Sequence, residues 1–136
     1  MRKLSLILML ALLISMLSAC TMPWDEKSDG YTQISYEEAK KMMDEQEDII
    51  ILDVRTEEEF KGGYIKGAIL FPSQEVNEET AAEKLPDKDQ TILIYCSSGG
   101  RSKKVAQQLA DMGYTSLYEF GGINSWPYEI YYDVEE

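Results

Sequence analysis

The residues best suited to chemistry lie in one short stretch, where a cysteine is followed by a small, flexible loop and an arginine. They are Cys96, Ser97, Ser98, Gly99, Gly100 and Arg101. Residues 91–95 (TILIY) predict a buried strand before this stretch, and residues 101–112 predict a helix after it. A loop that leads from a strand into a helix N-terminus turns backbone N–H groups inward and binds anions. Such a setting also lowers the pKa of a thiol and exposes it as thiolate, so we predict that Cys96 is a nucleophile within a substrate- or anion-binding loop.

Strands and helices are predicted to alternate along the chain. The expected strands cover residues 31–34, 49–54, 69–71, 91–95 and 116–120, and the expected helices cover residues 36–46, 57–60, 77–85 and 101–112. The apolar run at 49–54 is continuous, which is typical of a strand covered on both faces. This order predicts an α/β fold with a central, mostly parallel five-stranded sheet and helices on both faces.

Three charged residues follow the second predicted strand. Asp53 and Arg55 stand at its end, and Glu59 lies in the short helix after it. Ligands of parallel sheets bind beyond the carboxyl ends of the strands, so these residues are expected near Cys96. We predict supporting roles for them. Asp53 and Arg55 would form a structural ion pair, with substrate contact by Arg55 as the alternative, and Glu59 would hold Arg101, which could otherwise face the bound anion.

Composition narrows the classes of function. The 136 residues suffice for one domain, and a hydrophobic content of 44% indicates that it folds. With 13 basic and 25 acidic residues, the net charge of -12 argues against binding to nucleic acid or electrostatic docking to an anionic membrane. The chain has no histidine, which excludes a histidine base and a histidine-ligated metal. We predict no metal, no cofactor and a monomeric protein.

The N-terminal residues predict export. Arg2 and Lys3 precede a nearly unbroken apolar run at residues 4–17. A run of 14 residues is shorter than the ~20 that span a bilayer and is typical of a signal peptide. Residues 17–20 (LSAC) resemble the lipobox of bacterial lipoproteins, which implies cleavage before Cys20 and a diacylglycerol on its thiol. An ordinary cleaved signal peptide and an uncleaved anchor are the alternatives.

These features predict three segments. Residues 1–19 would be the lipoprotein signal peptide, residues 20–30 the lipidated Cys20 and a tether, and residues 31–136 the domain. The protein would be anchored by lipid alone to the outer face of the bacterial cell membrane, or lie in the periplasm of a cell with an outer membrane. An acylated Cys20 cannot form a disulfide, which leaves Cys96 as a lone thiol of the kind more often functional than structural in an exported protein.

Four stretches together resemble a rhodanese-like domain, the fold of single-domain sulfurtransferases. They are residues 52–60 (LDVRTEEEF), 62–72 (GGYIKGAILFP), 95–102 (YCSSGGRS) and 113–127 (GYTSLYEFGGINSWP). Each is weak alone, but four in order at the family's spacing are specific, and they span nearly all of residues 31–127. Two positions differ from the family pattern. Tyr64 replaces a common histidine, and Ser97 replaces an arginine or lysine frequent in thiosulfate sulfurtransferases, which weakens the expectation of thiosulfate as the preferred donor.

The resemblance implies a two-step transfer of sulfur. The Cys96 thiolate would take a sulfane sulfur from thiosulfate, polysulfide or a low-molecular-weight persulfide, and a thiol, cyanide or a protein cysteine would accept it. The amides of the loop from Ser97 to Arg101 would stabilise the thiolate and the outer sulfur, and the hydroxyls of Ser97 and Ser98 could add donors.

Two other functions compete with this interpretation. Cysteine phosphatases and arsenate reductases separate their cysteine and arginine by five residues, whereas four lie between Cys96 and Arg101, which favours a pocket for one sulfur atom. A binding or persulfide-sensing module on the cell surface would use the same loop without turnover.

Overall fold

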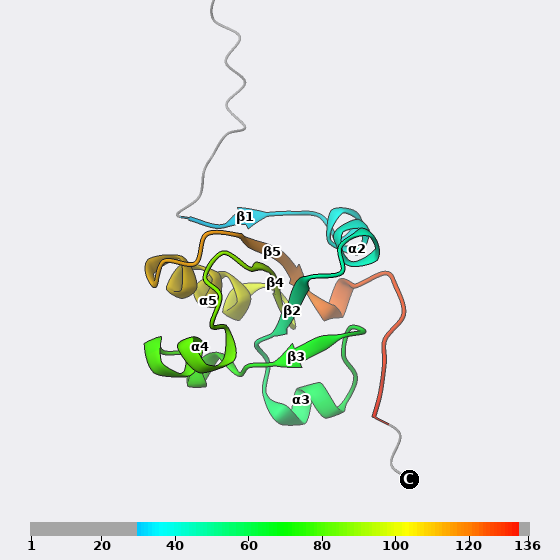
Figure 1. The fold of residues 1–136 in the computed structure, drawn as a ribbon. Helices are drawn as coiled ribbons and strands as arrows, with labels where there is room; N and C mark the ends of the chain where they lie inside the picture. The colour runs from blue at the N-terminus through cyan, green and yellow to red at the C-terminus, as the bar shows by residue number, and fades with distance from the viewer. Residues whose placement is uncertain (1–29, 134–136) are drawn as a thin grey trace, which may run out of the picture.

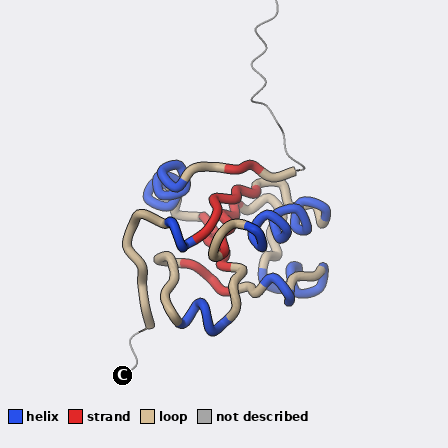
Figure 2. Tube along the Cα trace, turned by 180° about the vertical axis from the view of Figure 1, so that it is seen from behind, coloured by secondary structure: helices blue, strands red, loops and turns tan. Residues whose placement is uncertain are grey.

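The structure, a computed structural model, describes residues 30–133 (Figures 1 and 2). Its strands are β1 (Thr32–Gln33), β2 (Ile49–Asp53), β3 (Ala68–Leu70), β4 (Thr91–Cys96) and β5 (Leu117–Gly122). Its helices are α2 (Tyr36–Glu45), α3 (Glu57–Lys61), α4 (Glu78–Lys84) and α5 (Gly100–Asp111), with two short 3₁₀ turns, η1 (Ser73–Glu75) and η2 (Ile123–Ser125). The predicted signal peptide and Cys20 lie outside the described residues.

The five strands form one sheet in the order β1-β5-β4-β2-β3, and every neighbouring pair is parallel. Strand β4 therefore lies at the centre of the sheet. Figure 1 shows helices on both sides of it, so the predicted α/β fold is confirmed. No helix within residues 30–133 is both long and apolar enough to cross a bilayer.

Side chains of β4 alternate between the two faces and so separate two cores. Ile92, Ile94 and Cys96 belong to the core that α4 and α5 cover. Leu93 and Tyr95 belong to the other core, which α2 and the segment after β5 cover. Because successive side chains of a strand point to opposite faces, the register of β4 alone places the Cys96 thiol under the start of α5.

Local sequence explains where the helices begin. The side chains of Ser35, Thr56 and Asn77 each accept a hydrogen bond from a backbone N–H in the first turn of α2, α3 and α4. At α2 and α3 the N–H of the cap residue donates in turn to the carboxylate of Glu38 or Glu59, which completes a capping box. Helix α5 has no side-chain cap and begins at a glycine loop instead.

The end of β5 differs from the prediction. The last strand was expected to end at residue 120, but it continues through Gly122, which pairs with Cys96. The register shifts between Ile94 and Cys96, so an irregularity in the ladder brings both glycines beside the cysteine. Trp126, which follows η2, lies in the core and packs against Phe120.

Candidate active site

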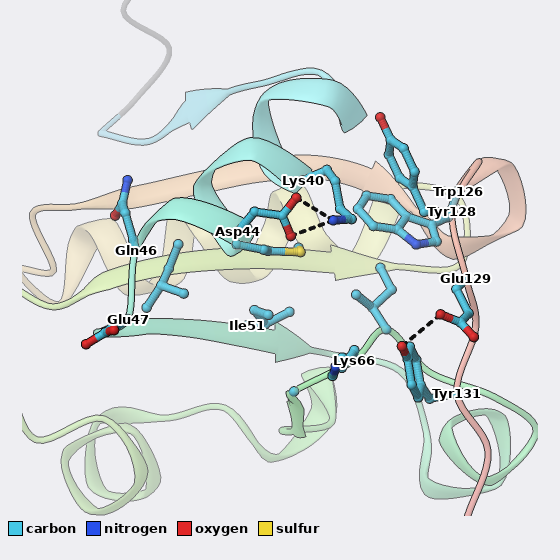
Figure 3. Close-up of a pocket in the computed structure, with 14 residues that line it drawn as sticks. Lys40, Asp44, Gln46, Glu47, Ile51, Lys66, Trp126, Tyr128, Glu129 and Tyr131 are labelled. Carbon is cyan, nitrogen blue, oxygen red and sulfur yellow. Dashed lines mark hydrogen bonds and ion pairs between the residues drawn. The ribbon is translucent and has the colours of Figure 1, made fainter.

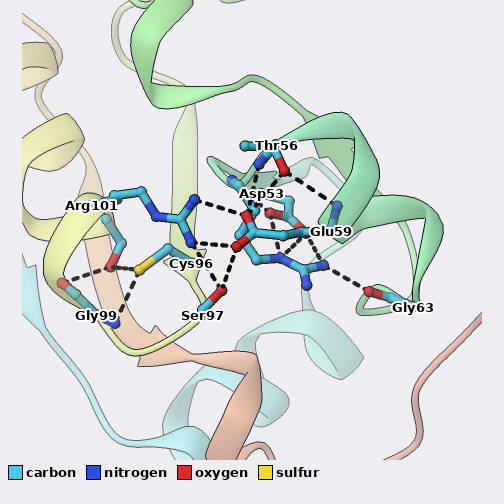
Figure 4. A network of polar contacts seen from close by, with 10 residues as sticks. Asp53, Thr56, Glu59, Gly63, Cys96, Ser97, Gly99 and Arg101 are labelled. Atoms are coloured by element: carbon cyan, nitrogen blue, oxygen red, sulfur yellow. Dashed lines mark hydrogen bonds and ion pairs between the residues drawn. The ribbon is translucent and has the colours of Figure 1, made fainter.

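The loop after β4 folds around the sulfur of Cys96 (Figure 4). The Gly99 N–H donates to Sγ at 3.0 Å, and the Ser102 hydroxyl oxygen lies 3.4 Å from Sγ. Gly99 has a φ of 103°, a left-handed conformation that glycine adopts without steric cost and that starts α5 at the next residue. The sulfur therefore sits at a helix N-terminus within a small cradle of N–H groups.

Two opposing effects set the acidity of this thiol. Burial disfavours the thiolate, while hydrogen bonds from the Ser102 hydroxyl and from the N–H groups of Ser102, Gly99 and Ser98 favour it. The hydrogen bonds prevail, and the pKa of Cys96 lies below its ordinary value. The predicted lowering of the pKa is thus present, and donors of the loop and of the first turn of α5 cause it.

Two details of the predicted loop need correction. Cys96 is not exposed: its residue is only 1% accessible, because β4 directs it into the core under α5. The donors also differ, since Ser98, Gly99 and Ser102 carry the contacts to the sulfur rather than the whole run from Ser97 to Arg101. The Ser97 hydroxyl turns away to a neighbouring ion pair, and Gly100 begins α5.

Arg101 holds the loop instead of facing a bound anion. Its guanidinium donates to both carboxylate oxygens of Glu59, at 2.8 and 3.0 Å, and to the Ser97 hydroxyl at 2.9 Å. The contact with Glu59 was expected, and it links α5 to α3 across the mouth of the loop (Figure 4). Hydrogen bonds from Arg101 lower the pKa of Glu59 to about 2, and those to Glu59 raise the pKa of Arg101.

Asp53 and Arg55 form the expected ion pair, and both are buried. Arg55 donates from Nε and Nη2 to the Asp53 carboxylate, at 3.0 and 2.7 Å, and from Nη2 to the Gly63 carbonyl at 2.7 Å. Burial opposes the charge of Arg55, but its contacts with Asp53 outweigh that effect and raise the Arg55 pKa. These partners tie β2 to the turn after α3, which is a structural role.

Two polar residues behind the sulfur, Ser102 and Glu119, were not predicted from the sequence. The Ser102 hydroxyl donates to Glu119 Oε1 at 2.6 Å, and the Gly121 N–H donates to the same oxygen at 2.8 Å. Both residues are buried, with accessibilities of 0% and 2%. A usable signal was present: Glu119 is an acidic residue inside an otherwise apolar predicted strand, where it needs a polar partner.

Besides a cavity of about 190 Å³ beside α4, the described residues enclose two larger ones. One, of about 530 Å³, lies beside Arg101 between η1 and α5 and is lined by Ser73, Gln74, Arg101, Lys104, Gln107 and Gln108. The other, of about 690 Å³, lies between α2, β2 and the C-terminal segment (Figure 3), and Cys96 is not among its lining residues. Within residues 30–133, no three cysteine or acidic side chains are grouped so that they could hold a metal ion.

The sequence pattern of the rhodanese-like domain family matches residues 35–128, so the chain belongs to this family. Thiosulfate sulfurtransferase PspE of Escherichia coli is 38% identical over 72 residues, which cover 53% of this chain and 68% of PspE. Thiosulfate sulfurtransferase GlpE of Coxiella burnetii is 34% identical over 97 residues, which cover 71% of this chain and 87% of GlpE.

Solved structures agree with this assignment. A rhodanese-like domain protein from Staphylococcus aureus superposes with a TM-score of 0.62 at 31% identity, over 76% of this chain and 99% of that one. The predicted resemblance to the family is therefore confirmed for the part of the chain that the structure describes.

Proposed function

We propose that this protein is a sulfurtransferase that carries a sulfane sulfur on Cys96. The observation that supports this most directly is the cradle around Sγ, in which the Gly99 N–H lies 3.0 Å from the sulfur. Donors fixed in place before the reaction favour a thiolate and, after transfer, a negatively charged outer sulfur. Thiosulfate sulfurtransferases among the relatives support the same class of reaction.

The reaction has two displacements. In the first, the Cys96 thiolate attacks the outer sulfur of thiosulfate, polysulfide or a low-molecular-weight persulfide. A Cys96–sulfur bond forms while the donor's sulfur–sulfur bond breaks, and sulfite or the shorter thiolate leaves with the electron pair. In the second, a thiolate or cyanide attacks the outer sulfur of the persulfide, and Cys96 leaves as thiolate.

The surroundings of Cys96 favour this reaction over hydrolysis of a phosphate ester. The sulfur is buried, and Arg101, which a phosphatase would need for its oxyanion, is engaged by Glu59 and Ser97. The loop thus suits a single sulfur atom better than a tetrahedral oxyanion.

Intact mass spectrometry of the purified protein tests the proposal. Incubation with thiosulfate, polysulfide or glutathione persulfide is expected to add the mass of one sulfur atom, and cyanide or a thiol should remove it. The variant Cys96→Ala should show no gain. A wild-type protein that gains no sulfur from any donor would rule out catalysis and favour the binding or sensing module.

We also infer that the protein is exported and anchored by lipid on Cys20, from the basic and apolar residues before it and the small residues beside it. Expressed in a bacterium fed labelled fatty acid, the wild type should carry label in the membrane fraction, and Cys20→Ala should not. Label on the Cys20→Ala variant would contradict this inference.

A further inference from the structure

A buried carboxylate stands behind the nucleophile and has no role in the reaction described above. Glu119 Oε1 accepts the Ser102 hydroxyl at 2.6 Å, and the Ser102 oxygen lies 3.4 Å from Cys96 Sγ. Strand β5 supplies Glu119, the first turn of α5 supplies Ser102, and β4 supplies Cys96. Three elements thus build an unbroken line of polar atoms from the sulfur to a carboxylate.

The single hydrogen of the Ser102 hydroxyl determines the direction of these contacts. Three acceptors lie within reach: the Gly99 carbonyl at 3.1 Å, the Gly121 carbonyl at 3.3 Å and Glu119 Oε1 at 2.6 Å. An ionised carboxylate at the shortest distance is the strongest of the three. While Glu119 is charged and receives this hydrogen, Ser102 presents only lone pairs to Cys96, and the thiol is the donor of that contact. The hydrogen bond from Ser102 that favours the thiolate forms only when the hydroxyl hydrogen turns from Glu119 to the sulfur.

We propose that Glu119 is a positioning residue that takes up and returns the proton of Cys96 through the Ser102 hydroxyl. The S–H bond of Cys96 breaks and its proton joins Ser102 Oγ, while the original hydroxyl proton of Ser102 moves to Glu119 Oε1. The products are a thiolate, a Ser102 hydroxyl whose proton now faces the sulfur, and a neutral Glu119. Nothing is oxidised or reduced, and the total charge of the three groups is unchanged.

The neighbouring titratable side chains do not compete for this proton, because each already has a partner. They are Arg101 of α5 with Glu59 of α3, Arg55 with Asp53 of β2, and the Tyr36 hydroxyl of α2, which donates to the Gly122 carbonyl. Two anions held close together in a buried site repel each other. A proton kept within the three groups avoids that repulsion. After the second displacement, the thiolate released from the persulfide can recover this proton from Glu119.

We call this transfer from Cys96 through Ser102 to Glu119 the proton relay. The pH dependence of Cys96 alkylation distinguishes the proton relay from a merely structural contact. The transfer exchanges no proton with solvent, so the wild-type rate with iodoacetamide, a neutral reagent, should change by less than about twofold between about pH 5 and pH 7. In Glu119→Gln the thiol must lose its proton to solvent, so the rate should fall as the pH is lowered over the same range, by up to about tenfold per pH unit wherever the pH lies below the pKa of Cys96. The glutamine keeps an acceptor for Ser102 and Gly121 but binds no proton.

Three further variants complete the test. Ser102→Ala should show the same steep profile because the connecting hydroxyl is gone, and Ser102→Thr should restore the flat one. Glu83→Gln removes an exposed carboxylate of α4 and should retain the wild-type profile. A flat profile in Glu119→Gln or Ser102→Ala would overturn the relay. A steep profile in the wild type would overturn it without any variant, even if the substituted proteins fail to fold.

The relay rests on the proposed function only in assigning Cys96 as the nucleophile, and the two can fail separately. If the protein forms a persulfide but the wild type and all variants have identical pH profiles, the sulfurtransferase proposal is supported and the relay is contradicted. A flat wild-type profile that becomes steep in Glu119→Gln, without persulfide from any donor, would leave the relay standing and reject sulfur transfer.

Discussion

Arg101 shows that the type of a residue does not decide its role. An arginine at the end of an anion-binding loop has the chemistry of a substrate ligand. Here both of its contacts with Glu59 are made in the bidentate geometry that arginine and carboxylate prefer, and a third goes to Ser97. Cys96 acts on Arg101 through charge rather than contact, since the thiolate helps to raise the pKa of the guanidinium.

The ion pair between Glu59 and Arg101 should depend on pH in a defined direction. Glu59 has a pKa lowered from 4.5 to about 2, so its contribution to stability is complete above about pH 4.5 and is lost as the pH falls towards 2. Glu59→Gln should cost about 0.5–1 kcal/mol at pH 6, because the pair is partly exposed. Glutamine keeps one oxygen for the capping box at α3, but its amide nitrogen cannot accept from Arg101, so the bidentate contact is lost together with the charge.

Urea unfolding of both proteins at several pH values measures this difference. The difference in the free energy of unfolding should shrink steadily from about pH 4.5 to about pH 2. Glu83→Gln, which removes an exposed carboxylate of α4, should stay close to wild type throughout. A deficit in Glu59→Gln that is equally large at low pH would show that the charge of Glu59 is not what stabilises the loop.

Sequence alone predicted some of these contacts and missed others for a physical reason. The partner of Arg101 could be named because Glu59 follows a strand whose end lies beside the loop. The contact of Ser102 with Glu119 could not, because it depends on how β5 is aligned with β4, and the register shift between Ile94 and Cys96 breaks the simple alternation. Such an irregularity leaves no pattern in the sequence.

At the scale of elements, the active loop is held by direct backbone contact with the end of β5. A side-chain carbon on Gly122 would lie 2.0 Å from the Ser97 carbonyl oxygen and 2.5 Å from the Ser98 nitrogen. No rotamer change can relieve such a clash, because both neighbours are backbone atoms. The glycine is thus required by close approach of two segments.

Substitution of this glycine should therefore displace the loop. Gly122→Ala is expected to lower the free energy of unfolding by about 3 kcal/mol or more, as overpacking against backbone does. Gly100→Ala is the matched control: its added carbon meets nothing within 4 Å. Alanine also suits the first turn of a helix, so this variant should stay within about 1 kcal/mol of wild type. Thermal or urea unfolding measures both, and equal losses in the two variants would contradict the close approach.

The elements themselves were largely predictable, since capping residues and apolar runs marked α2, α3, α4, β2 and β4 within a residue or two. The end of β5 was not. Its two glycines read as a turn by composition, whereas the structure uses their lack of side chains to bring a strand against the loop. Local propensity cannot tell these two uses of glycine apart, because the difference lies in what approaches from elsewhere in the chain.

At the scale of the whole molecule, charge is distributed unevenly. The chain has a net charge of -12, yet the start of α5, which follows the loop after Cys96, carries Arg101, Lys103 and Lys104. Lys104 lines the cavity of about 530 Å³ beside Arg101, whereas Lys103 is exposed on the same helix and does not line it. Since Ser97 supplies no cation, Lys104 would offset the general repulsion of an anionic donor in the proposed reaction.

This placement predicts a dependence of the proposed sulfur transfer on Lys104. With thiosulfate, a dianion, Lys104→Glu should lower kcat/KM about threefold to tenfold, because a nearby attraction becomes a repulsion. Lys103→Glu changes the net charge equally but lies outside the cavity, so its effect should be less than about twofold. Steady-state assays at low and high salt measure both variants, and the Lys104→Glu deficit should diminish as salt screens the charges. Equal deficits in the two variants would mean that overall charge, and not the cavity beside Arg101, governs the approach of the donor.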